Sequence, residues 1–295
     1  MSDYVQQNQT RCSFNGSESW VILSDIEQSI KQKVEAIGTP LKDWNVNIYR
    51  GILTGYNEAF IITTEKRDEI LANCQSDKER ERTEELIRPI LRGRDIRRYG
   101  VEWAGLWIIN THNGIKGVKE RINIEEYPAI KAHLDYFWTK ISTRTDKGDT
   151  PYNLRNCAYL DDLSKQKIVW IELSDSPKFT ICDQLYPLNT VFFLTGDNLY
   201  PLLGMLNSHL VYWYYTRCLG TTSGVGTSRW LKYTMDLLPL KVATSDELST
   251  MVKNLIDAKS SGDSCDYLDK QIDDEVFTEY NLTSEEIEFL SLWPK

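Results

Sequence analysis

The chain has 295 residues and a formal net charge of −9, and 41% of its residues are hydrophobic. This length and composition suffice for one large hydrophobic core or two smaller ones. The six cysteines lie far apart without a CxxC pair, and only three histidines accompany them, so we expect reduced thiols and no zinc site. No apolar run approaches the ~18 residues of a membrane span, and the polar N-terminus lacks the apolar segment of a signal peptide. We therefore expect a cytoplasmic protein without membrane contact.

The negative charge is unevenly distributed along the chain. The segment 241–295 contains five basic and thirteen acidic residues, a balance of −8, so the preceding residues are nearly neutral. A nearly neutral body can still carry a basic face, because local clusters decide the field at a surface. The segment 241–295 is expected to form an acidic tail, and the body remains compatible with a nucleic-acid ligand.

The first ordered element is expected to be a short helix. Residues 1–19 are polar and should form a flexible N-terminus. Ser24 and Glu27 match a capping box, and apolar residues follow at helical spacing as far as Ile37. The sequence Gly-Thr-Pro then ends the pattern. We expect a helical lead-in across residues 20–48.

The stretch 49–63 joins two kinds of structure. Gly55 lies beside Thr54 and Asn57, a composition that suits a tight turn with exposed N–H groups. The apolar run 59–62 that follows predicts a buried strand. A polar, glycine-containing loop next to a strand is a common way to present contacts to a ligand, and an ordinary turn without function is the alternative.

An arginine cluster follows at residues 88–99, with the sequence RPILRGRDIRRY. The charged stretch 65–85 before it is expected to be an exposed helix or a connection. Five arginines accompany one acid, Asp95, and the interleaved apolar residues should fix the segment to a core. Guanidinium groups held in this way suit phosphates and guanine edges. A solvated face or an internal set of ion pairs is the alternative.

The middle of the chain alternates between strand and helix patterns. Strands are expected at 106–110, 167–173, 178–182 and 190–194, which suggests a mixed sheet. A helix is expected to include Pro128 in its first turn. The polar stretch 142–153, which contains Arg144, is expected to be a surface loop.

The clearest helical pattern covers residues 198–219, and Gly220 ends it. The loop 220–230 that follows has the sequence GTTSGVGTSRW. Its hydroxyl and N–H groups can serve phosphates or base edges, and Trp230 offers a ring for stacking. The loop lacks the GxxxxGK[ST] pattern of a P-loop, and a flexible connector is the alternative. Two further helices are expected in the tail.

Several short motifs in a fixed order resemble a known family. They are GILTGYNEAFII, RPILRGRDIRRY, YPAIKAHL, KIVWIEL, LLGMLNSHLVYWYY and a closing LLPL. In this order they resemble the TaqI-like C-terminal specificity domain, the target-recognition part of adenine-specific DNA methyltransferases and of fused type IIG restriction-modification enzymes. The resemblance extends from about Trp20 to Trp293. It implies that the chain recognises double-stranded DNA in a bacterial restriction-modification system.

The catalytic motifs of such enzymes do not occur in this sequence. It has neither an Asn-Pro-Pro-Tyr motif to hold an extruded adenine nor a glycine-rich loop for S-adenosylmethionine. The resemblance therefore implies a non-catalytic specificity domain without a cofactor. Its expected partner is an adenine-specific methyltransferase domain, with or without an endonuclease domain, in the same parent chain or as a separate subunit. The rival hypotheses are a metal-dependent nuclease using Asp161, Asp162 or Glu172, and a protein-docking module without DNA binding.

The expected fold is α+β, with a mixed curved sheet that recognises DNA and with flanking helices. The expected divisions are a flexible N-terminus (1–19), a helical lead-in (20–48), a target-recognition domain (49–240) and an acidic helical tail (241–295). The candidate DNA-binding residues lie in the two loops, the arginine cluster and the polar stretch: Thr54, Gly55, Asn57, Arg92, Arg94, Arg97, Arg98, Arg144, Thr221, Ser223, Gly224, Thr227, Ser228, Arg229 and Trp230. No catalytic residue and no metal ligand is expected.

Overall fold

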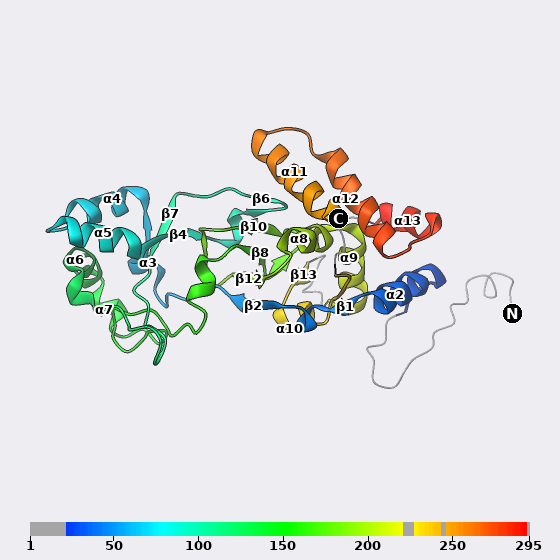
Figure 1. Cartoon of the computed structure of the whole chain (residues 1–295). Helices are drawn as coiled ribbons and strands as arrows, with labels where there is room; N and C mark the ends of the chain where they lie inside the picture. Colours follow the sequence, from blue (N-terminus) through cyan, green and yellow to red (C-terminus); the bar gives the residue numbers. More distant parts are fainter. Residues whose placement is uncertain (1–21, 221–226, 243–245, 294–295) are drawn as a thin grey trace. The chain divides into compact units, whose positions relative to one another are not determined.

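The structure is a computed structural model that describes residues 22–220, 227–242 and 246–293. The chain divides into two compact units, each assembled from separate stretches of sequence (Figure 1). Residues 47–172 and 179–196 form the first, which we call the sheet unit. The described residues up to 46, those at 173–178 and those from 197 onward form the second, which we call the helical unit.

Two larger sheets organise the described residues of the sheet unit. One has the strand order β10-β8-β12-β2, and the other has the order β11-β4-β7-β3. The strands are β2 (Val46–Arg50), β3 (Ile61–Thr63), β4 (Ile87–Leu91), β7 (Leu106–Ile109), β8 (Lys167–Ile171), β10 (Thr180–Cys182), β11 (Tyr186–Pro187) and β12 (Val191–Gly196). A short antiparallel pair, β5 (Ile96–Arg97) and β6 (Gly100–Val101), follows β4.

The pairing of these strands is mixed, as predicted. Strand β11 runs parallel to β4, whereas β7 is antiparallel to both β4 and β3. Strand β8 is antiparallel to β10 and β12, with Val169 opposite Thr180 on one side and Phe193 on the other. All four predicted strand segments contain strands of these sheets. Strand β8 ends at Ile171, and Leu173–Ser174 forms a separate strand, β9, in the helical unit.

Helices cover the sheet that contains β3, β4 and β7. They are α3 (Asn57–Phe60), α4 (Thr64–Ala72), α5 (Asp77–Leu86), α6 (Pro128–Tyr136) and α7 (Trp138–Ile141). Phe60, Ile108, Ile130 and Phe193 belong to one apolar core that runs from these helices through both sheets. Pro128 occupies the first turn of α6, as predicted. The α+β fold is therefore confirmed.

One predicted strand in this unit is partly wrong. The apolar run 59–62 was expected to be extended. Ala59 and Phe60 instead lie in α3, and the strand β3 starts at Ile61. Both kinds of structure bury this short run equally well, so periodicity alone does not distinguish them. The charged stretch 65–85 forms most of α4 and α5, which are capped by the side chains of Thr63 and Ser76.

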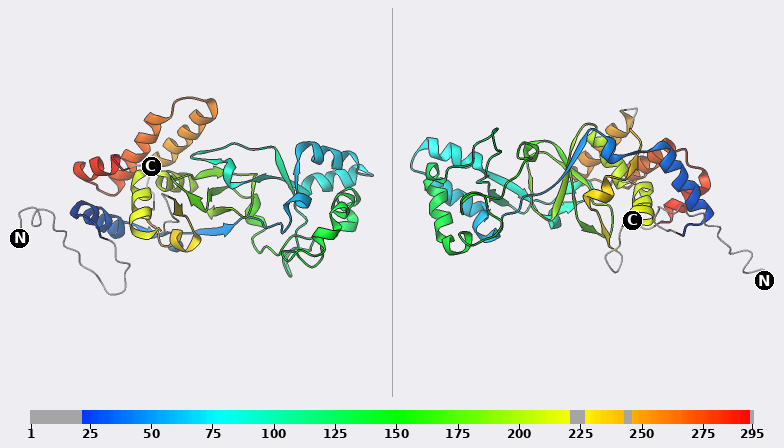
Figure 2. Two further views of the ribbon diagram at one scale, coloured as in Figure 1. Left: turned by 180° about the vertical axis from the view of Figure 1, so that it is seen from behind. Right: turned by 90° about the horizontal axis from the view of Figure 1, so that it is seen from below.

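Both ends of the described chain contribute to the helical unit. Its helices are α2 (Asp25–Ile37), α8 (Leu199–Asn207), α9 (His209–Tyr214), α10 (Lys232–Met235), α11 (Glu247–Ser261), α12 (Asp266–Glu279) and α13 (Ser284–Ser291). Figure 2 shows α2 next to α13, and strand β1 (Thr39–Pro40) pairs with β14 (Pro239–Leu240). The predicted capping box of Ser24 and Glu27 is present. The buried helix α8 packs against α11 and α12.

The long helix predicted at 198–219 is interrupted. Ser208 is extended, with φ of −73° and ψ of 157°, and its hydroxyl caps α9 by accepting a hydrogen bond from Val211. The last five residues, Tyr215–Leu219, form a π-helical turn that ends at Gly220. Residues on both sides of Ser208 are buried, so the hydrophobic pattern continues across the break and conceals it.

Three further observations concern the described residues as a whole. Cys74, Cys157, Cys182, Cys218 and Cys265 are free thiols. None of the helices that the structure describes is long and apolar enough to cross a membrane. Within residues 22–220, 227–242 and 246–293, no group of three or more His, Cys, Asp or Glu side chains is arranged to hold a metal ion.

Candidate nucleic-acid interface

A buried arginine supports the first predicted loop. Arg144 was expected on an exposed loop, but only 8% of its surface is accessible. Its guanidinium donates hydrogen bonds to the carbonyl oxygens of Thr54 and Asn153, the latter at 2.5 Å. The group lies 4.2 Å from the centroid of the Phe60 ring. Burial lowers the pKa of Arg144 to about 10. The expected exposure of Arg144 is wrong, because its guanidinium joins two loops inside the sheet unit.

The three candidate residues of this first loop differ in what they expose. The Thr54 side chain is buried, and its hydroxyl donates to Oδ1 of Asn57 at 2.5 Å. Gly55 and Asn57 are exposed. Gly55 has a φ of +69°, and a Cβ at this position would lie 2.5 Å from the carbonyl oxygen of Asp146, so the turn requires glycine. Asn57 therefore presents a side chain to solvent, and Thr54 orients it.

Asn153 connects this loop to a second loop that the sequence analysis did not single out. The buried Asn153 amide donates to the carbonyl oxygen of Ile122 at 2.9 Å. Its Oδ1 accepts a hydrogen bond from the hydroxyl of Thr150 at 2.6 Å. Ile122 directly follows the segment 113–121, NGIKGVKER, which we call the basic loop. Through Arg144 and Asn153, the first loop and the basic loop share one hydrogen-bonded support.

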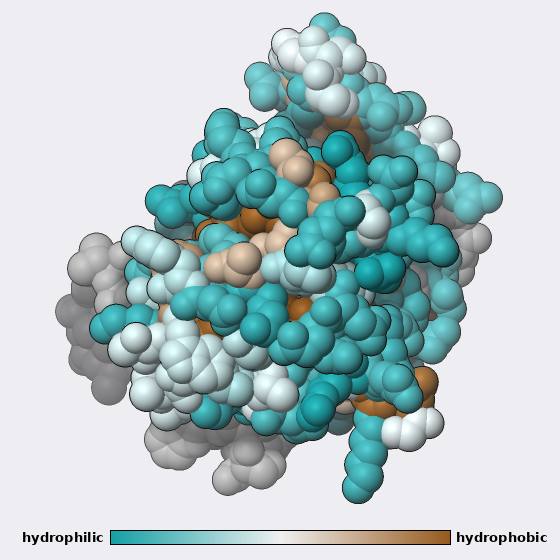
Figure 3. Space-filling view, turned by 90° about the vertical axis from the view of Figure 1, so that its left-hand side faces the viewer, coloured by the Kyte–Doolittle hydropathy of each residue, from teal (hydrophilic) through white to brown (hydrophobic). Residues whose placement is uncertain are grey.

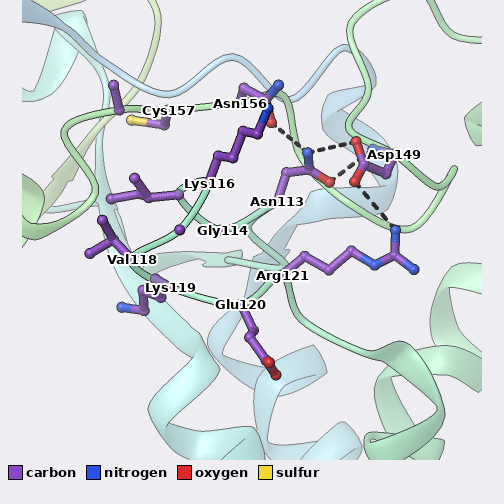
Figure 4. A pocket seen from close by; sticks show the side chains of 13 residues that line it. Asn113, Gly114, Lys116, Val118, Lys119, Glu120, Arg121, Asp149, Asn156 and Cys157 are labelled. Atoms are coloured by element: carbon purple, nitrogen blue, oxygen red, sulfur yellow. Dashed lines mark hydrogen bonds and ion pairs between the residues drawn. The ribbon is translucent and has the colours of Figure 1, made fainter.

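The basic loop forms one wall of a pocket of about 1040 Å³ (Figure 4). Residues 156–158 and Asp149 complete the lining. Nδ2 of Asn113 donates to Oδ1 of Asp149 at 3.0 Å, and the Asp149 N–H donates back to Oδ1 of Asn113 at 2.8 Å. Asn113 also donates to the side chain of Asn156. A single asparagine therefore fixes the basic loop to both neighbouring segments.

Two titratable side chains at the pocket, His112 and Cys157, are held in their neutral forms. Burial lowers the pKa of His112, and the nearby Lys119 lowers it further. Neutral His112 accepts a hydrogen bond at Nδ1 from the N–H of Gly114, at 3.2 Å. Burial also raises the pKa of Cys157 to about 11, so its thiol stays protonated at neutral pH. The charge at this pocket therefore comes from its exposed side chains, among them Lys116, Lys119 and Arg121.

The residues of the arginine cluster separate into internal and exposed groups. Arg92 makes a paired interaction with the buried Asp95, with Nε to Oδ2 at 2.9 Å and a second nitrogen to Oδ1 at 2.6 Å. Arg94 is exposed. Arg97 lies 2.5 Å from the exposed Glu102, and the guanidinium of Arg98 lies over the Tyr99 ring. Arg92 therefore serves the local fold, while Arg94 and Arg97 carry exposed positive charge.

The second predicted loop belongs to the helical unit. Thr221, Ser223 and Gly224 lie outside the described residues. Ser228 and Arg229 form β13, which pairs with β9 so that Arg229 lies opposite Leu173. Ser228 is buried, Thr227 is partly exposed and Arg229 is exposed. The strand pairing fixes the backbone of this end of the loop and leaves the Arg229 side chain at the surface.

Trp230 does not present the open ring that the sequence suggested. Only 1% of its surface is exposed, and its ring stacks on Tyr215 with the centroids 3.8 Å apart. Tyr212 lies beside it at 6.3 Å. The sequence of the loop does not show whether an aromatic ring is exposed for stacking on a base or is stacked inside the protein. In this structure the Trp230 ring packs inside the helical unit, directly after the exposed Arg229 in sequence.

The acids of the rival nuclease hypothesis are engaged with cations. Asp162 lies 2.7 Å from Lys165, and Glu172 lies 3.4 Å from Arg50. Asp161 is exposed and lies 3.9 Å from Lys119. These contacts are those of separate surface ion pairs.

The surface of the sheet unit is mostly polar at the end that carries α4 to α7. Figure 3 shows hydrophilic side chains over most of this face, with small hydrophobic patches between them. The exposed large side chains include Tyr136 and Trp138, on either side of Phe137 in the α6–α7 segment. Such a surface suits a polar or charged ligand better than an apolar one.

The sequence contained one signal for the basic loop that its analysis missed. Three cations, Lys116, Lys119 and Arg121, fall within six residues, and two glycines with positive φ, Gly114 and Gly117, lie before and among them. The support by Asn113 and Asn153 depends on contacts between distant segments, so nothing local indicated that the loop is fixed.

Mixed sheets flanked by helices, with polar loops held by buried side chains, define an α+β domain. The chain belongs to the TaqI-like C-terminal specificity domain family, whose model matches residues 88–240, slightly more than half of the sequence. The matched segment includes the arginine cluster, the basic loop and the described part of the loop that ends at Trp230.

Three larger proteins are similar to this chain over about a third of their own length. The type II methyltransferase M.PaeR7I of Pseudomonas aeruginosa is 22% identical over 196 residues, which is 62% of this chain and 30% of the methyltransferase. The type IIL restriction-modification enzyme MmeI, solved in complex with DNA, matches 83% of this chain with a TM-score of 0.57 and 13% identity. That match covers 34% of the MmeI chain and shows a shared fold. The type IIG restriction endonuclease BpuSI aligns with a TM-score of 0.48 and 14% identity, over 87% of this chain and 33% of its own.

Proposed function

We propose that the chain recognises a specific sequence in double-stranded DNA for a restriction-modification system. The observation that carries the proposal is the family match over residues 88–240. Catalysis belongs to another domain, an adenine-specific methyltransferase with or without an endonuclease, in the same parent chain as in a type IIG enzyme or in a separate subunit. The chain itself is proposed to need no cofactor, since it lacks an Asn-Pro-Pro-Tyr motif and a glycine-rich S-adenosylmethionine loop.

The exposed candidate residues divide between backbone contacts and base contacts. Arg94 and Arg97 have exposed guanidinium groups suited to phosphates, which set the position of a protein on a duplex. Arg229 and Asn57 carry the side chains that pair in a bidentate manner with guanine and adenine edges in the major groove. Both side chains are exposed. The β13–β9 pairing fixes the backbone of Arg229, and the Thr54 hydroxyl holds the side chain of Asn57. We infer that Arg229 and Asn57 select the sequence.

The remaining candidates act through these exposed residues. Thr54, Arg92, Arg144, Ser228 and Trp230 are buried or internally paired, so they hold the loops in shape rather than reach a ligand. Gly55 contributes the turn, and Arg98 and Thr227 remain candidates for backbone contacts. For Thr221, Ser223 and Gly224, which lie outside the described residues, DNA contact stays a prediction.

Selection from a randomised duplex library at one fixed salt concentration tests the proposal. The wild-type chain should enrich one sequence. The Arg229→Ala variant should lose about 1 to 3 kcal/mol of binding free energy for that sequence, with its weak binding to random DNA largely unchanged. Arg80→Ala, which removes an exposed arginine from α5, is the matched control and should enrich the wild-type sequence. The chain alone should transfer no methyl group.

Two results would contradict the proposal. If the wild-type chain enriches no sequence at any salt concentration that permits binding, sequence recognition is wrong. If it binds no duplex at all, the protein-docking hypothesis replaces it. If Arg229→Ala enriches the same sequence as strongly as the wild type, the recognition role of Arg229 is wrong while the function stands.

A further inference from the structure

We propose that the basic loop, residues 113–121, binds phosphates of the DNA backbone at the rim of its pocket. The inference rests on the proposed function, since it assigns the ligand of this loop within DNA recognition. None of the loop residues belongs to the sequence-predicted set. The ligand chemistry is a phosphodiester, which a protein contacts in the same way whatever the base sequence.

The charges of the loop point outward and are only weakly engaged. Lys116, Lys119 and Arg121 are all exposed. Among the described residues Lys116 has no ion-pair partner, and Lys119 is 3.9 Å from the exposed Asp161. Arg121 pairs with Asp149 at 3.3 Å, with both side chains at least half exposed. Exposed pairs of this kind contribute about 0 to 1 kcal/mol, so a phosphate can compete for these cations at little cost.

The acids of the pocket lining, Glu120 and Asp149, offset only part of the charge of the three cations. Glu120 is the acid within the loop, and Figure 4 shows its side chain extending away from Asn113 and Asp149. Asp149 is occupied by hydrogen bonds from Asn113 and by the ion pair with Arg121. The lysines are therefore the groups of the rim that are most available to an anion.

The loop backbone is shaped before any ligand arrives. The N–H of Ile115 donates to the carbonyl oxygen of Lys119 at 2.8 Å, and the N–H of Lys119 donates to that of Ile115 at 2.9 Å. The N–H of Val118 closes the turn by donating to Ile115 at 2.9 Å. Gly117 has a φ of +76° inside this turn. Fixed geometry lowers the ordering cost that a flexible lysine-rich loop would incur on binding.

The turn also leaves backbone donors available. The N–H groups of Lys116 and Gly117 donate to no backbone oxygen of the described residues. Backbone N–H groups in a turn that contains a left-handed residue form small anion-binding concavities. The anchoring of Asn113 to Asp149 and Asn156, together with the support of Ile122 by Asn153, holds this turn against the pocket wall. Charge, donors and rigidity thus coincide at one place.

The test measures how binding depends on salt. Affinities of the full chain for a random-sequence duplex are measured between about 50 and 200 mM salt, for the wild type and for Lys116→Ala, Lys119→Ala and the double variant. Each phosphate contact removed should lower the slope of log affinity against log salt by about 1. The loss of affinity over this range should then be about 3.5-fold smaller for each contact.

Matched variants separate a phosphate contact from a change in folding or in total charge. Lys78→Ala removes the same charge from the exposed surface of α5, outside the pocket lining, and should keep the wild-type slope. Lys116→Arg retains the cation and should also keep the wild-type slope. Equal thermal unfolding of all variants is expected, because the lysines are exposed.

The outcomes distinguish this inference from the proposed function. If the slopes of Lys116→Ala, Lys119→Ala and the double variant all equal that of the wild type, the inference is overturned even when the wild type still enriches a sequence. If the lysine variants enrich a different sequence, the loop contacts bases and the assignment to phosphate is overturned. If the lysine variants have lower slopes but the wild type enriches no sequence, phosphate binding by the basic loop is supported and sequence recognition is contradicted.

Discussion

The ring of Tyr215 lies parallel to the ring of Trp230, with an interplanar angle of 10° and centroids 3.8 Å apart. The Tyr215 hydroxyl donates to the carbonyl oxygen of Arg229 and also contacts the hydroxyl of Thr234 at 2.6 Å. Tyr215 begins the π-helical turn at the end of the α8–α9 segment. This pair therefore fixes the described end of the loop 220–230 to the buried helices of the helical unit.

Removing the Tyr215 hydroxyl should disturb recognition more than overall binding. Tyr215→Phe keeps the stacking ring but leaves the Arg229 carbonyl without this donor, so the unfolding free energy should fall by about 1 to 2 kcal/mol. The Arg229 side chain should become less well positioned. The base preference of the selected duplexes should then fall at the base pair that Arg229 contacts. The measurement is library selection beside chemical denaturation.

Trp230→Ala provides the contrasting variant, because it deletes a fully buried ring. It should lower the unfolding free energy by about 3 to 5 kcal/mol. Wild-type selectivity in Tyr215→Phe, combined with normal stability, would contradict the positioning role of Tyr215.

Arg144 should be important for stability rather than for contact with DNA. Arg144→Ala removes the donors to the Thr54 and Asn153 carbonyl oxygens and should destabilise the chain by about 2 to 4 kcal/mol. Arg144→Lys should recover little, because an ammonium group does not reproduce the planar fork. Denaturant unfolding monitors both variants.

Arg155 gives the control for this prediction. It lies in the same segment, is largely exposed and is 3.5 Å from Asp146. Arg155→Ala should change the unfolding free energy by less than about 0.5 kcal/mol. Comparable effects of Arg144→Ala and Arg155→Ala would show that the buried guanidinium is not a support.

Neighbouring arginines of the cluster should behave oppositely. Arg92→Ala leaves the buried Asp95 carboxylate without its paired partner and should cost about 3 to 5 kcal/mol of stability. Arg94→Ala should leave stability unchanged and weaken binding to all duplex sequences, with a flatter salt dependence. Thermal unfolding and salt titration of each variant separate the two roles. Reduced DNA affinity in a fully stable Arg92→Ala would be evidence against this division.

Acid should destabilise the helical unit through Glu286. Burial alone would raise the pKa of Glu286, but hydrogen bonds from Lys33, Ser29 and the Thr283 backbone outweigh it and lower the pKa. Because the pKa is lower in the folded state, this carboxylate stabilises the fold above its ordinary pKa of 4.5. The stabilisation is lost as the pH falls through the folded-state value.

The Glu286→Gln variant tests this linkage. It should be less stable than the wild type at neutral pH, and its unfolding free energy should change less between about pH 5 and pH 2. Glu288→Gln, an exposed change on the same helix α13, is the control and should follow the wild-type pH curve. If the unfolding free energies of the wild type and Glu286→Gln depend on pH in the same way, Glu286 does not cause the loss of stability in acid.

Local sequence patterns predicted elements with strong local signals. The capping box at Ser24, the first-turn proline of α6 and the β-rich runs of β8, β10 and β12 all form as expected. The break at Ser208 was missed because the buried pattern continues across it, and α3 was assigned to a strand because a short apolar run fits either structure.

The amino-acid sequence was sufficient to predict the family and the mixed α+β class. These depend on residue order and local periodicity, which are present in the chain before it folds. The tertiary structure decided which candidates reach the surface. From the sequence, Arg144 looks no different from an exposed arginine such as Arg94, and Trp230 looks no different from an exposed aromatic residue. In the structure, Arg144 is buried against Thr54, and Trp230 is buried against Tyr215, both of which are distant in sequence. Tertiary contacts also fix the basic loop, because Asn153 binds the residue that follows it and Asn113 within it bonds to Asp149 and Asn156, in segments that no local pattern connects.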